Sequence, residues 1–329
     1  MDGWIPAKLH RMEGPGEGHG WAAQVIWRLG YRAAQLVAVL LTVATLLFCL
    51  VRLSASPATL LAGAQASQAQ VRTASLVYGL DRPIWNQYLN FVGRALRLDF
   101  GDSPAHRTAA LEVVRVRLPA TLLLAAATLA VTSLLAVSLG VWLGLRARQP
   151  EHGWAFRLLL TGQSLPALVV GLVLAHALGL TSAGGGKSPL TLALSVATLT
   201  WWLVPRFARL TAGSVAGATR HRWVLTARAM GATSRELLWN HVLPNALLAA
   251  TALVGVQVAF LLSGVVVVEW LFGWPGVGDL MVVSIRAGDF PVVEAAIFMI
   301  AALVYATYAV VDLIITTVDP RLRRHGASM

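Results

Sequence analysis

The sequence predicts an all-α integral membrane protein that crosses the bilayer with six helices. Of the 329 residues, 57% are hydrophobic and only 12% are charged, and the mean hydropathy is +0.68. A soluble chain of this composition would expose too much hydrocarbon to water. Six stretches are almost free of charge, and each meets or approaches the ~20 apolar residues that a helix needs to cross a hydrocarbon core. They are residues 33–51, 118–145, 158–180, 188–205, 246–268 and 295–317.

Basic residues are distributed unevenly over the segments between these stretches. If the N-terminus is inside, the cytoplasmic segments carry 16 Lys and Arg against 6 Asp and Glu, whereas the external segments carry 10 and 8. Such a bias sets the orientation of a membrane protein, because Lys and Arg are retained on the cytoplasmic side. We therefore expect both termini to be cytoplasmic, and we attribute the net charge of +11 to topology rather than to nucleic-acid binding.

The N-terminal region is expected to form a flexible cytoplasmic tail, residues 1–27, followed by a retained membrane anchor. The first 20 residues hold five glycines and two prolines, which is typical of a poorly ordered segment. The anchor, residues 33–51, is longer than a typical signal-peptide core and lacks a small-residue cleavage site. Its Cys49 is the only cysteine in the sequence, which excludes an intrachain disulfide, so we expect Cys49 to serve packing.

Residues 52–117 are expected to lie on the extracytoplasmic side. Residues 62–77 are rich in Ala, Gln and Ser and predict a short helix, and Pro83 favours the first turn of a second helix. Gly101 lies in the turn sequence Leu98-Asp-Phe-Gly-Asp-Ser103 and is expected to take a positive φ.

A glycine-rich sequence, Gly184-Gly-Gly-Lys-Ser188, resembles the end of a phosphate-binding P-loop. However, Thr181 replaces the first glycine of that motif, and the hydropathy pattern predicts no β-strand before it. The predicted orientation also places it on the side of the membrane that has no ATP. We interpret it as the loop between the third and fourth spans.

The last external loop, residues 269–294, contains Leu271-Phe-Gly-Trp-Pro-Gly-Val-Gly-Asp279, in which Gly and Pro predict a tight, irregular backbone. Irregular backbone near membrane depth persists only where it is buried in protein or lines a wet cavity. Two interpretations stay open, an element of the translocation path and a plain structural turn. The path candidates are Glu269, Trp274, Pro275, Gly276 and Gly278.

The cytoplasmic insert, residues 206–245, carries the sharpest functional signal. Helix formers over Thr226–Met230 are followed by Gly231, which can break the helix, and Ser234–His241 resumes it. The residues predict a helix, a glycine turn and a second helix that project from the membrane. Such a helix either docks in the groove of a partner or lies beside the lipid headgroups, anchored by its arginines.

The amino-acid sequence of the insert resembles that of a known loop. Its string Trp223-Val-Leu-Thr-Ala-Arg-Ala-Met-Gly231 is followed by His241-Val-Leu-Pro-Asn245, with Pro244 thirteen residues after the glycine. This spacing is similar to the EAA loop of ABC importer permeases, and the fuller string to the dipeptide/oligopeptide/nickel permease family. Further segments extend the resemblance over residues 28–325: Gly79-Leu-Asp-Arg-Pro83, Leu98-Asp-Phe-Gly-Asp-Ser103, Trp274-Pro-Gly-Val-Gly278, Asp289-Phe-Pro-Val-Val293 and Val318-Asp-Pro-Arg321.

The resemblance implies a type I ABC importer permease in the bacterial cytoplasmic (inner) membrane, with residues 28–325 as its transmembrane domain and 206–245 as its coupling loop. A second homologous permease, two ABC ATPase subunits and an extracytoplasmic substrate-binding protein would complete the importer. The partner subunits would use ATP, and this chain, which lacks a P-loop, is expected to bind no cofactor and to catalyse no reaction itself. The residues implied to couple to the ATPase are Thr226, Ala227, Arg228, Ala229, Gly231, Ala232 and Arg235.

The chain departs from the family pattern at two charged positions of the loop. Leu225 stands where the EAA glutamate is expected, and Met230 stands where lysine is frequent, which removes two possible charge pairs with the ATPase. The short connection between the third and fourth spans looks more like that of the nickel and metallophore-type members than that of the dipeptide permeases, so the resemblance implies a nickel or metallophore-type substrate over a short peptide. No cluster of metal-ligating residues is evident, but a permease that receives a chelated metal does not need one.

The alternative from another class is an autonomous secondary transporter or channel, which would place ionisable residues within its spans. His176, Gln163, Gln257 and Asp312 lie within the predicted spans, and we expect them to face protein or water. Asp312 lies close to the cytoplasmic end of the last span, so capping or pairing with arginine is favoured over a proton relay. The EAA-like insert would have no role in such a transporter.

Overall fold

The computed structural model describes residues 17–54, 66–77, 81–146, 154, 157, 161, 164–178, 186–244, 261 and 264–318. In these ranges the regular structure is helical, apart from one isolated β-bridge between Asp102 and Ala109. The named helices are α1 (Glu17–Ser54), α3 (Gln68–Val77), α4 (Ile84–Leu96), α5 (Ala110–Leu145), α7 (Ala167–Ala177), α8 (Pro189–Ala218), α9 (Arg222–Ala229), α10 (Ser234–Leu237), the π-helical turn η2 (Leu238–Val242), α12 (Val277–Ala287) and α13 (Phe290–Val318).

Four helices of the described part are long and apolar enough to cross a membrane, namely Gly30–Leu50 within α1, all of α5, all of α8, and Phe290–Val311 within α13. A fifth candidate consists of two helical segments, Gly264–Phe272 and α12, which meet at 74°. The predicted third span is described chiefly by the 11 residues of α7, and most of 246–268 lies outside the described residues. The fold is therefore all-α and multi-pass, and the count of six spans stays a prediction.

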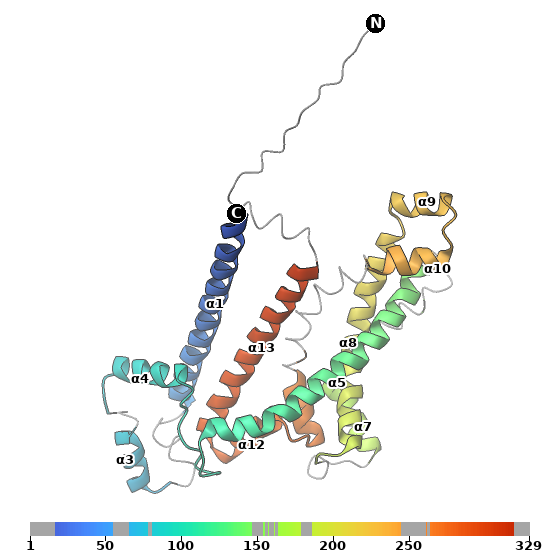
Figure 1. Ribbon diagram of the computed structural model, residues 1–329. Helices are drawn as coiled ribbons and strands as arrows, with labels where there is room; N and C mark the ends of the chain where they lie inside the picture. The colour runs from blue at the N-terminus through green and yellow to red at the C-terminus, as the bar shows by residue number, and fades with distance from the viewer. Residues whose placement is uncertain are drawn as a thin grey trace.

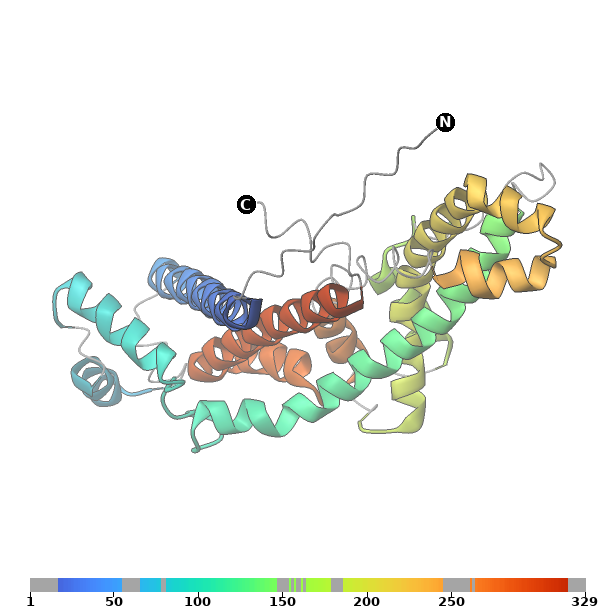
Figure 2. The ribbon, with the colours of Figure 1, turned by 45° about the horizontal axis from the view of Figure 1, so that its top comes forward.

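The long helices run between two opposite ends of the molecule, which correspond to the two predicted aqueous sides of the membrane (Figures 1 and 2). α1 lies beside α13, and α13 also packs on α5. In Figure 1, the first turn of α1, the last turn of α13 and the short helix α9 lie toward the top, whereas α3, α4 and α12 lie toward the bottom. Long helices thus connect a face that carries α9 to a face that carries α3 and α4.

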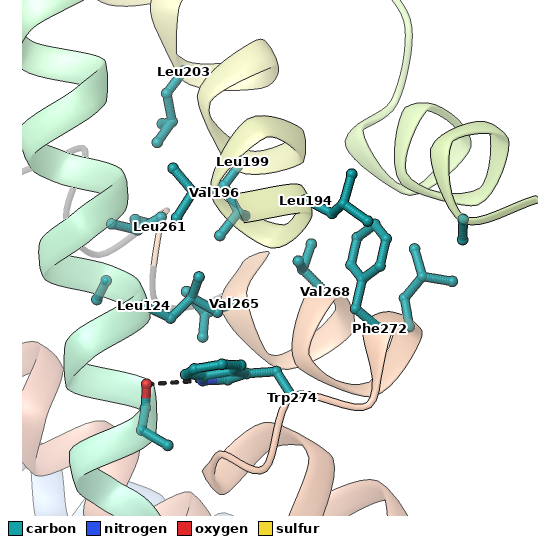
Figure 3. Packing of buried hydrophobic residues seen from close by; sticks show 14 of the residues in the cluster. Leu124, Leu194, Val196, Leu199, Leu203, Leu261, Val265, Val268, Phe272 and Trp274 are labelled. Atoms are coloured by element: carbon teal, nitrogen blue, oxygen red, sulfur yellow. Dashed lines mark hydrogen bonds between the residues drawn. The ribbon is translucent and has the colours of Figure 1, made fainter. Parts of the chain in front are cut away.

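The tightest helix pair is α5 with α8. A Cβ atom added at Gly140 would lie 2.5 Å from Cβ of Thr211, and one added at Gly144 would lie 2.7 Å from Cβ of Val215. Two glycines four residues apart allow the helix backbones to approach closely, which is a common way to join helices in membranes. Farther along the pair, Leu124, Leu199 and Leu203 belong to the largest buried cluster. Figure 3 shows part of this cluster.

A second buried cluster holds the opposite end of the molecule together. It joins Ala44 of α1, Val114 of α5, Val277 of α12 and Val292 of α13 to Phe100 in the loop before α5. The ring of Phe100 lies 5.3 Å from that of Phe298 between centroids. α12 is therefore a packed element and not a free loop.

Several helices extend beyond the predicted spans. α8 continues to Ala218, so residues 206–218 are helix rather than loop, and α5 begins at Ala110 rather than near 118. α1 begins at Glu17, so residues 17–27 of the predicted tail 1–27 are helical, and its first 16 residues lie outside the described part. The same reason applies to α8, α5 and α1. Hydropathy indicates where contact with hydrocarbon ends, whereas a helix continues as long as its backbone N–H and C=O groups stay hydrogen-bonded.

Other local predictions agree with the structure. Gly101 has φ 87° in the turn before α5, and Pro83 stands immediately before α4 as its N-cap. Ser188 of the P-loop-like sequence is the N-cap of α8, and its hydroxyl accepts a hydrogen bond from the Thr191 amide at 3.1 Å. The loop 269–294 contains α12, so irregular backbone there is limited to the few residues that join two helical segments.

Candidate functional site

The cytoplasmic insert forms a small helical hairpin at the end of α8. α9 follows the last turn of α8 after three residues, and α10 with η2 returns toward the bundle. Figures 1 and 2 show α9 at the edge of the molecule, and in Figure 1 α10 lies between it and the end of α5. The helix–turn–helix predicted around Gly231 is confirmed as a local structure.

Gly231 ends α9 in the manner that the sequence predicted. Its φ is 90°, which is a conformation that residues with a Cβ rarely adopt. The Gly231 amide donates to the Arg228 carbonyl, and the Ala232 amide donates to the Ala227 carbonyl, both at 3.0 Å. These two bonds constitute a Schellman motif, which satisfies carbonyl groups at the helix end. No atom lies within 4 Å of a Cβ built at Gly231, so the turn requires glycine for its backbone and not for space.

The second helix of the hairpin begins with a capping box. The Glu236 carboxylate accepts hydrogen bonds from the Thr233 amide at 2.9 Å and from the Thr233 hydroxyl at 2.8 Å. The Glu236 amide donates to the Thr233 hydroxyl in return, at 3.3 Å. This reciprocal pair stabilises a helix start, and the two hydrogen bonds lower the pKa of Glu236 below its usual value. The Glu236 carboxylate is therefore engaged in hydrogen bonds within the hairpin.

A compact apolar cluster attaches the hairpin to the bundle. Val224 of α9, Leu237 of α10 and Val242 of η2 are buried against Val215 near the end of α8. Val141 of α5 is partly buried against the same cluster. Because these side chains come from four helical elements, the cluster packs α9, α10 and η2 against the end of α8, with α5 beside it.

The outer surface of the hairpin carries most of the residues that were predicted to couple to a partner. Thr226, Arg228, Ala229, Gly231 and Arg235 are exposed, and Ala227 and Ala232 are half-buried. Two large apolar side chains are also exposed on this hairpin, Met230 at 79% and Trp239 at 60%. The hairpin thus exposes arginines and apolar side chains on helices that are packed against the bundle.

The other predicted group gathers at the junction between Gly264–Phe272 and α12. Glu269 and Trp274 are buried, Gly276 and Gly278 are buried, and Pro275 is half-buried. The Trp274 indole N–H donates to the Ala120 carbonyl of α5 at 3.0 Å, as the dashed line in Figure 3 shows. The structure therefore brings all five candidates together, but inside the packed chain.

Glu269 serves this junction as a helix cap. Its carboxylate accepts a hydrogen bond from the Gly278 amide at 2.7 Å, and the hydroxyl of Thr121 accepts one from the Val277 amide at 2.8 Å. Both amides belong to the first turn of α12, whose donors have no partner within the helix. A Cβ at Gly276 would lie 2.1 Å from Oε1 of Glu269, so glycine is needed there for space. The geometry favours a structural turn that fixes the direction of α12.

Sequence reasoning missed Thr121 and Ala120 as partners of this junction. They lie about 150 positions earlier in the chain, and nothing local marks them out among the threonines and alanines of α5. Their role follows only from the packing of α5 against α12. Among the other polar residues considered, His176 is exposed on α7, and the side chains of Gln163, Gln257 and Asp312 lie outside the described part.

A groove of about 1220 Å³ runs between α5, α8 and the segment around Trp154 and Leu165. Its described lining is apolar apart from Thr161 and Thr200. Amide and charged groups of a peptide need hydrogen-bonding partners when they leave water, so this groove suits hydrocarbon better than a polar solute. No group of three or more His, Cys, Asp or Glu suited to a metal ion occurs among the described residues.

Long apolar helices with a small polar hairpin at one end define a class, that of multi-pass membrane proteins. The chain belongs to the family of binding-protein-dependent transport system inner membrane components, whose model matches residues 136–324. That match covers α8, the hairpin and the α12 junction. The dipeptide/oligopeptide-type resemblance inferred from the sequence is thereby confirmed.

Individual relatives agree over almost the whole chain. A probable peptide ABC transporter permease protein, y4tP of Sinorhizobium fredii, is 31% identical over 309 residues, covering 89% of this chain and 97% of the relative. The glutathione transport system permease protein GsiC is 31% identical in Escherichia coli K12 and 32% identical in Salmonella typhimurium. Both GsiC alignments span 302 residues, with 89% and 97% coverage.

The chain is therefore a permease component of an ABC importer, and it is a multi-pass protein of the inner membrane. Subunits of this kind are membrane components of transport systems and are not themselves enzymes. The dependence of the family on a binding protein implies that an ATPase and a substrate-binding protein are partners. The alternative of an autonomous secondary transporter or channel is not supported by these relatives.

Proposed function

We propose that this chain forms one half of the translocation pathway of a type I ABC importer and that α9 is its coupling helix. A second homologous permease would form the other half, and two ATPase subunits would dock on the hairpins of the two permeases. ATP would be bound and hydrolysed by these partners, and this chain would carry no cofactor. The observation that carries the proposal is the rigid attachment of an exposed helix to the ends of α5 and α8.

The mechanism follows from that attachment. Closure of the ATPases would displace α9, and the cluster around Val224 and Leu237 would pass the displacement to α8. Thr211 and Val215 of α8 pack directly against Gly140 and Gly144 of α5, so the two helices would move as one body. Rigid-body rotation of helices about an interface is a common form of switching, and the far end of this body would open or close the pathway.

The proposed topology places the hairpin, residues 206–245, and both termini in the cytoplasm. Residues 52–117, which include α3 and α4, would then face the substrate-binding protein. The positive-inside bias supports this orientation, and so does the position of the first turn of α1 and the last turn of α13 on the side of α9 (Figure 1). Within 28–325, six spans would complete the permease domain.

The junction of Glu269, Trp274, Pro275, Gly276 and Gly278 would shape the pathway indirectly. Because Glu269 and Trp274 are buried, we propose that they fix the angle at which α12 enters the bundle rather than contact the transported solute. The 74° bend between the two helical segments supports this role. Irregular backbone at such depth is tolerated because it is buried in protein.

For the substrate, we propose a short peptide, which includes the glutathione type of tripeptide. The names of the relatives support this class, and they do not support the nickel or metallophore-type substrate that the short connection between the third and fourth spans favoured. The specificity would reside largely in the binding protein. Thermal-shift measurements on the co-purified binding protein with glutathione, dipeptides and a nickel chelate would decide, and stabilisation by the chelate alone would overturn the peptide proposal.

The coupling proposal is tested by Gly231→Val in the complete importer. A β-branched residue at φ 90° is strained, so α9 would end differently and the hairpin would no longer fit its partner. We expect uptake and transport-coupled ATP hydrolysis to be lost, while membrane insertion and the amount of protein stay unchanged. Both would be measured in proteoliposomes that contain the binding protein.

Gly213→Val provides the matched control. Gly213 lies on an exposed side of α8, with ordinary φ and no atom within 4 Å of an added Cβ. Valine there introduces the same side chain without backbone strain, and we expect full uptake. Normal uptake by Gly231→Val would refute the coupling role of the hairpin.

A further inference from the structure

We infer that α4 is an interfacial helix, which lies in the headgroup region of the membrane surface opposite α9 and inserts Trp85 and Leu89 among the acyl chains. This role is independent of the coupling mechanism. It rests on three observations. α4 contacts the end of α1, the sides of α4 differ in polarity, and the axis of α4 runs across that of α1.

One side of α4 is fixed to α1. The Tyr88 hydroxyl shares a hydrogen bond with the Thr45 hydroxyl at 2.8 Å, and the Tyr88 ring packs edge-on against Phe48 at 5.3 Å between centroids. Arg52 donates a hydrogen bond to the side-chain carbonyl of Gln87. These contacts leave α4 no freedom to rotate about its own axis.

The contacts also set the depth of α4. The apolar span of α1 ends at Leu50, and the α1 residues that hold α4 run from Thr45 to Arg52. Since each residue of a helix rises about 1.5 Å, α4 is attached within ~10 Å of the position where the hydrocarbon-spanning stretch ends. Leu46 and Leu50 are themselves exposed at this end of α1, as expected for side chains that face lipid.

The two remaining sides of α4 differ in polarity. Trp85 is 75% exposed and Leu89 is 66% exposed, and these residues lie one helical turn apart, with Leu96 exposed on the same side farther along. Asn86 and Asn90 are also exposed and also one turn apart, and they form the polar side. A helix in the plane of the interface has this arrangement, with one side toward acyl chains and another toward water.

The direction of α4 agrees with this position. In Figure 1, α4 lies across the lower end of α1 rather than along it, at the end of the molecule far from α9. A helix that lies across the spans at this depth must present one side toward the membrane. Tryptophan is enriched at this level because its ring is apolar and its N–H needs a polar partner. Lipid is therefore the occupant that the position and chemistry of the exposed apolar side favour.

The test is spin labelling of the assembled importer in proteoliposomes of phosphatidylethanolamine and phosphatidylglycerol. Cys49 is replaced by alanine, and single cysteines are introduced by Trp85→Cys, Leu89→Cys, Asn86→Cys and Asn90→Cys. Power saturation then compares the collision of each label with oxygen, which concentrates in the bilayer, and with a water-soluble nickel complex. Leu96→Cys serves as a further site if Trp85→Cys reduces assembly.

We expect the ratio of oxygen to nickel accessibility to be several-fold higher at positions 85 and 89 than at positions 86 and 90. High nickel accessibility at all four positions would place both sides in water and would overturn the inference. Low accessibility to both reagents at 85 and 89 would mean that a protein subunit covers this side, which would also overturn it. Because uptake is not the readout, failure here is distinct from failure of the coupling proposal.

Discussion

Gly231 of the hairpin and the pair Gly276 and Gly278 of the α12 junction are required for two different physical reasons. At Gly231 the surroundings are open, and glycine is needed because φ is 90°. At Gly276 and Gly278 φ is not in the left-handed region, and glycine is needed because a Cβ would overlap Glu269 or Val266. The junction also has one glycine that the backbone requires, Gly273 at φ 65°, but Gly276 and Gly278 are required by packing that exists only inside the bundle.

The comparison predicts its largest effect at Gly278→Ala. An added Cβ would lie 2.3 Å from Cα of Val266, which is backbone and cannot move aside. Overpacking a well-packed core typically costs about 1–3 kcal/mol, and we expect the upper end here because the obstructing atom is backbone. Thermal unfolding of the purified protein in detergent would show a lowered midpoint and a reduced yield of monodisperse protein.

Gly264→Ala is the matched control for this substitution. Gly264 lies in the adjoining helical segment, and its added Cβ would meet only a terminal methyl of Leu199 at 3.5 Å. Alanine also favours a helix over glycine by up to about 1 kcal/mol. We expect unchanged or slightly raised stability, and a loss equal to that of Gly278→Ala would show that packing does not distinguish the two sites.

A smaller effect is expected when the open turn is substituted by asparagine. Among residues with a Cβ, asparagine tolerates the left-handed region best, so Gly231→Asn should relieve part of the ~1–2 kcal/mol strain that valine incurs. Both uptake and the thermal midpoint of Gly231→Asn should therefore lie between those of the wild type and Gly231→Val. Equal loss in both variants would show that any side chain at this position blocks the partner.

The smallest effect is expected at the capping box of the hairpin. The pKa of Glu236 is lowered by the hydrogen bonds from Thr233, so its stabilising contribution is present above the usual carboxylate pKa and is lost as the pH falls through the lowered value. Amide hydrogen exchange at the start of α10, corrected for its intrinsic pH dependence, should therefore accelerate as the pH falls below the usual carboxylate pKa. Glu236→Gln should remove this acceleration, and an unchanged pH profile would contradict the assignment.

The hairpin was predictable from sequence because its determinants are local. Helix formers before Gly231 and the Thr233-Ser-Arg-Glu236 pattern after it are signals that act within one turn. The same holds for Gly101. At these positions the sequence and the structure agree to within a few residues.

For the α12 junction, the sequence predicted where an irregular segment lies but not which residues it contacts. Glycine and proline marked an irregular segment, but the capping of α12 by Thr121 depends on a helix about 150 positions away, and a single sequence does not report such pairing. The length of α8 was missed for another reason. Residues 206–218 are less apolar than the span before them, although their side chains Phe207, Ala208 and Val215 are buried against other helices.

The length of α8 also determines how far the hairpin stands from the lipid. α8 has 30 residues and is therefore about 45 Å long, whereas the hydrocarbon core is ~30 Å thick. Roughly 15 Å is left over, which exceeds the thickness of one headgroup layer when the bilayer measures ~40–45 Å in all. If α9 engages the ATPase as proposed, the contact would form in water above the headgroups, and its strength should be insensitive to the charge of the lipids beneath it.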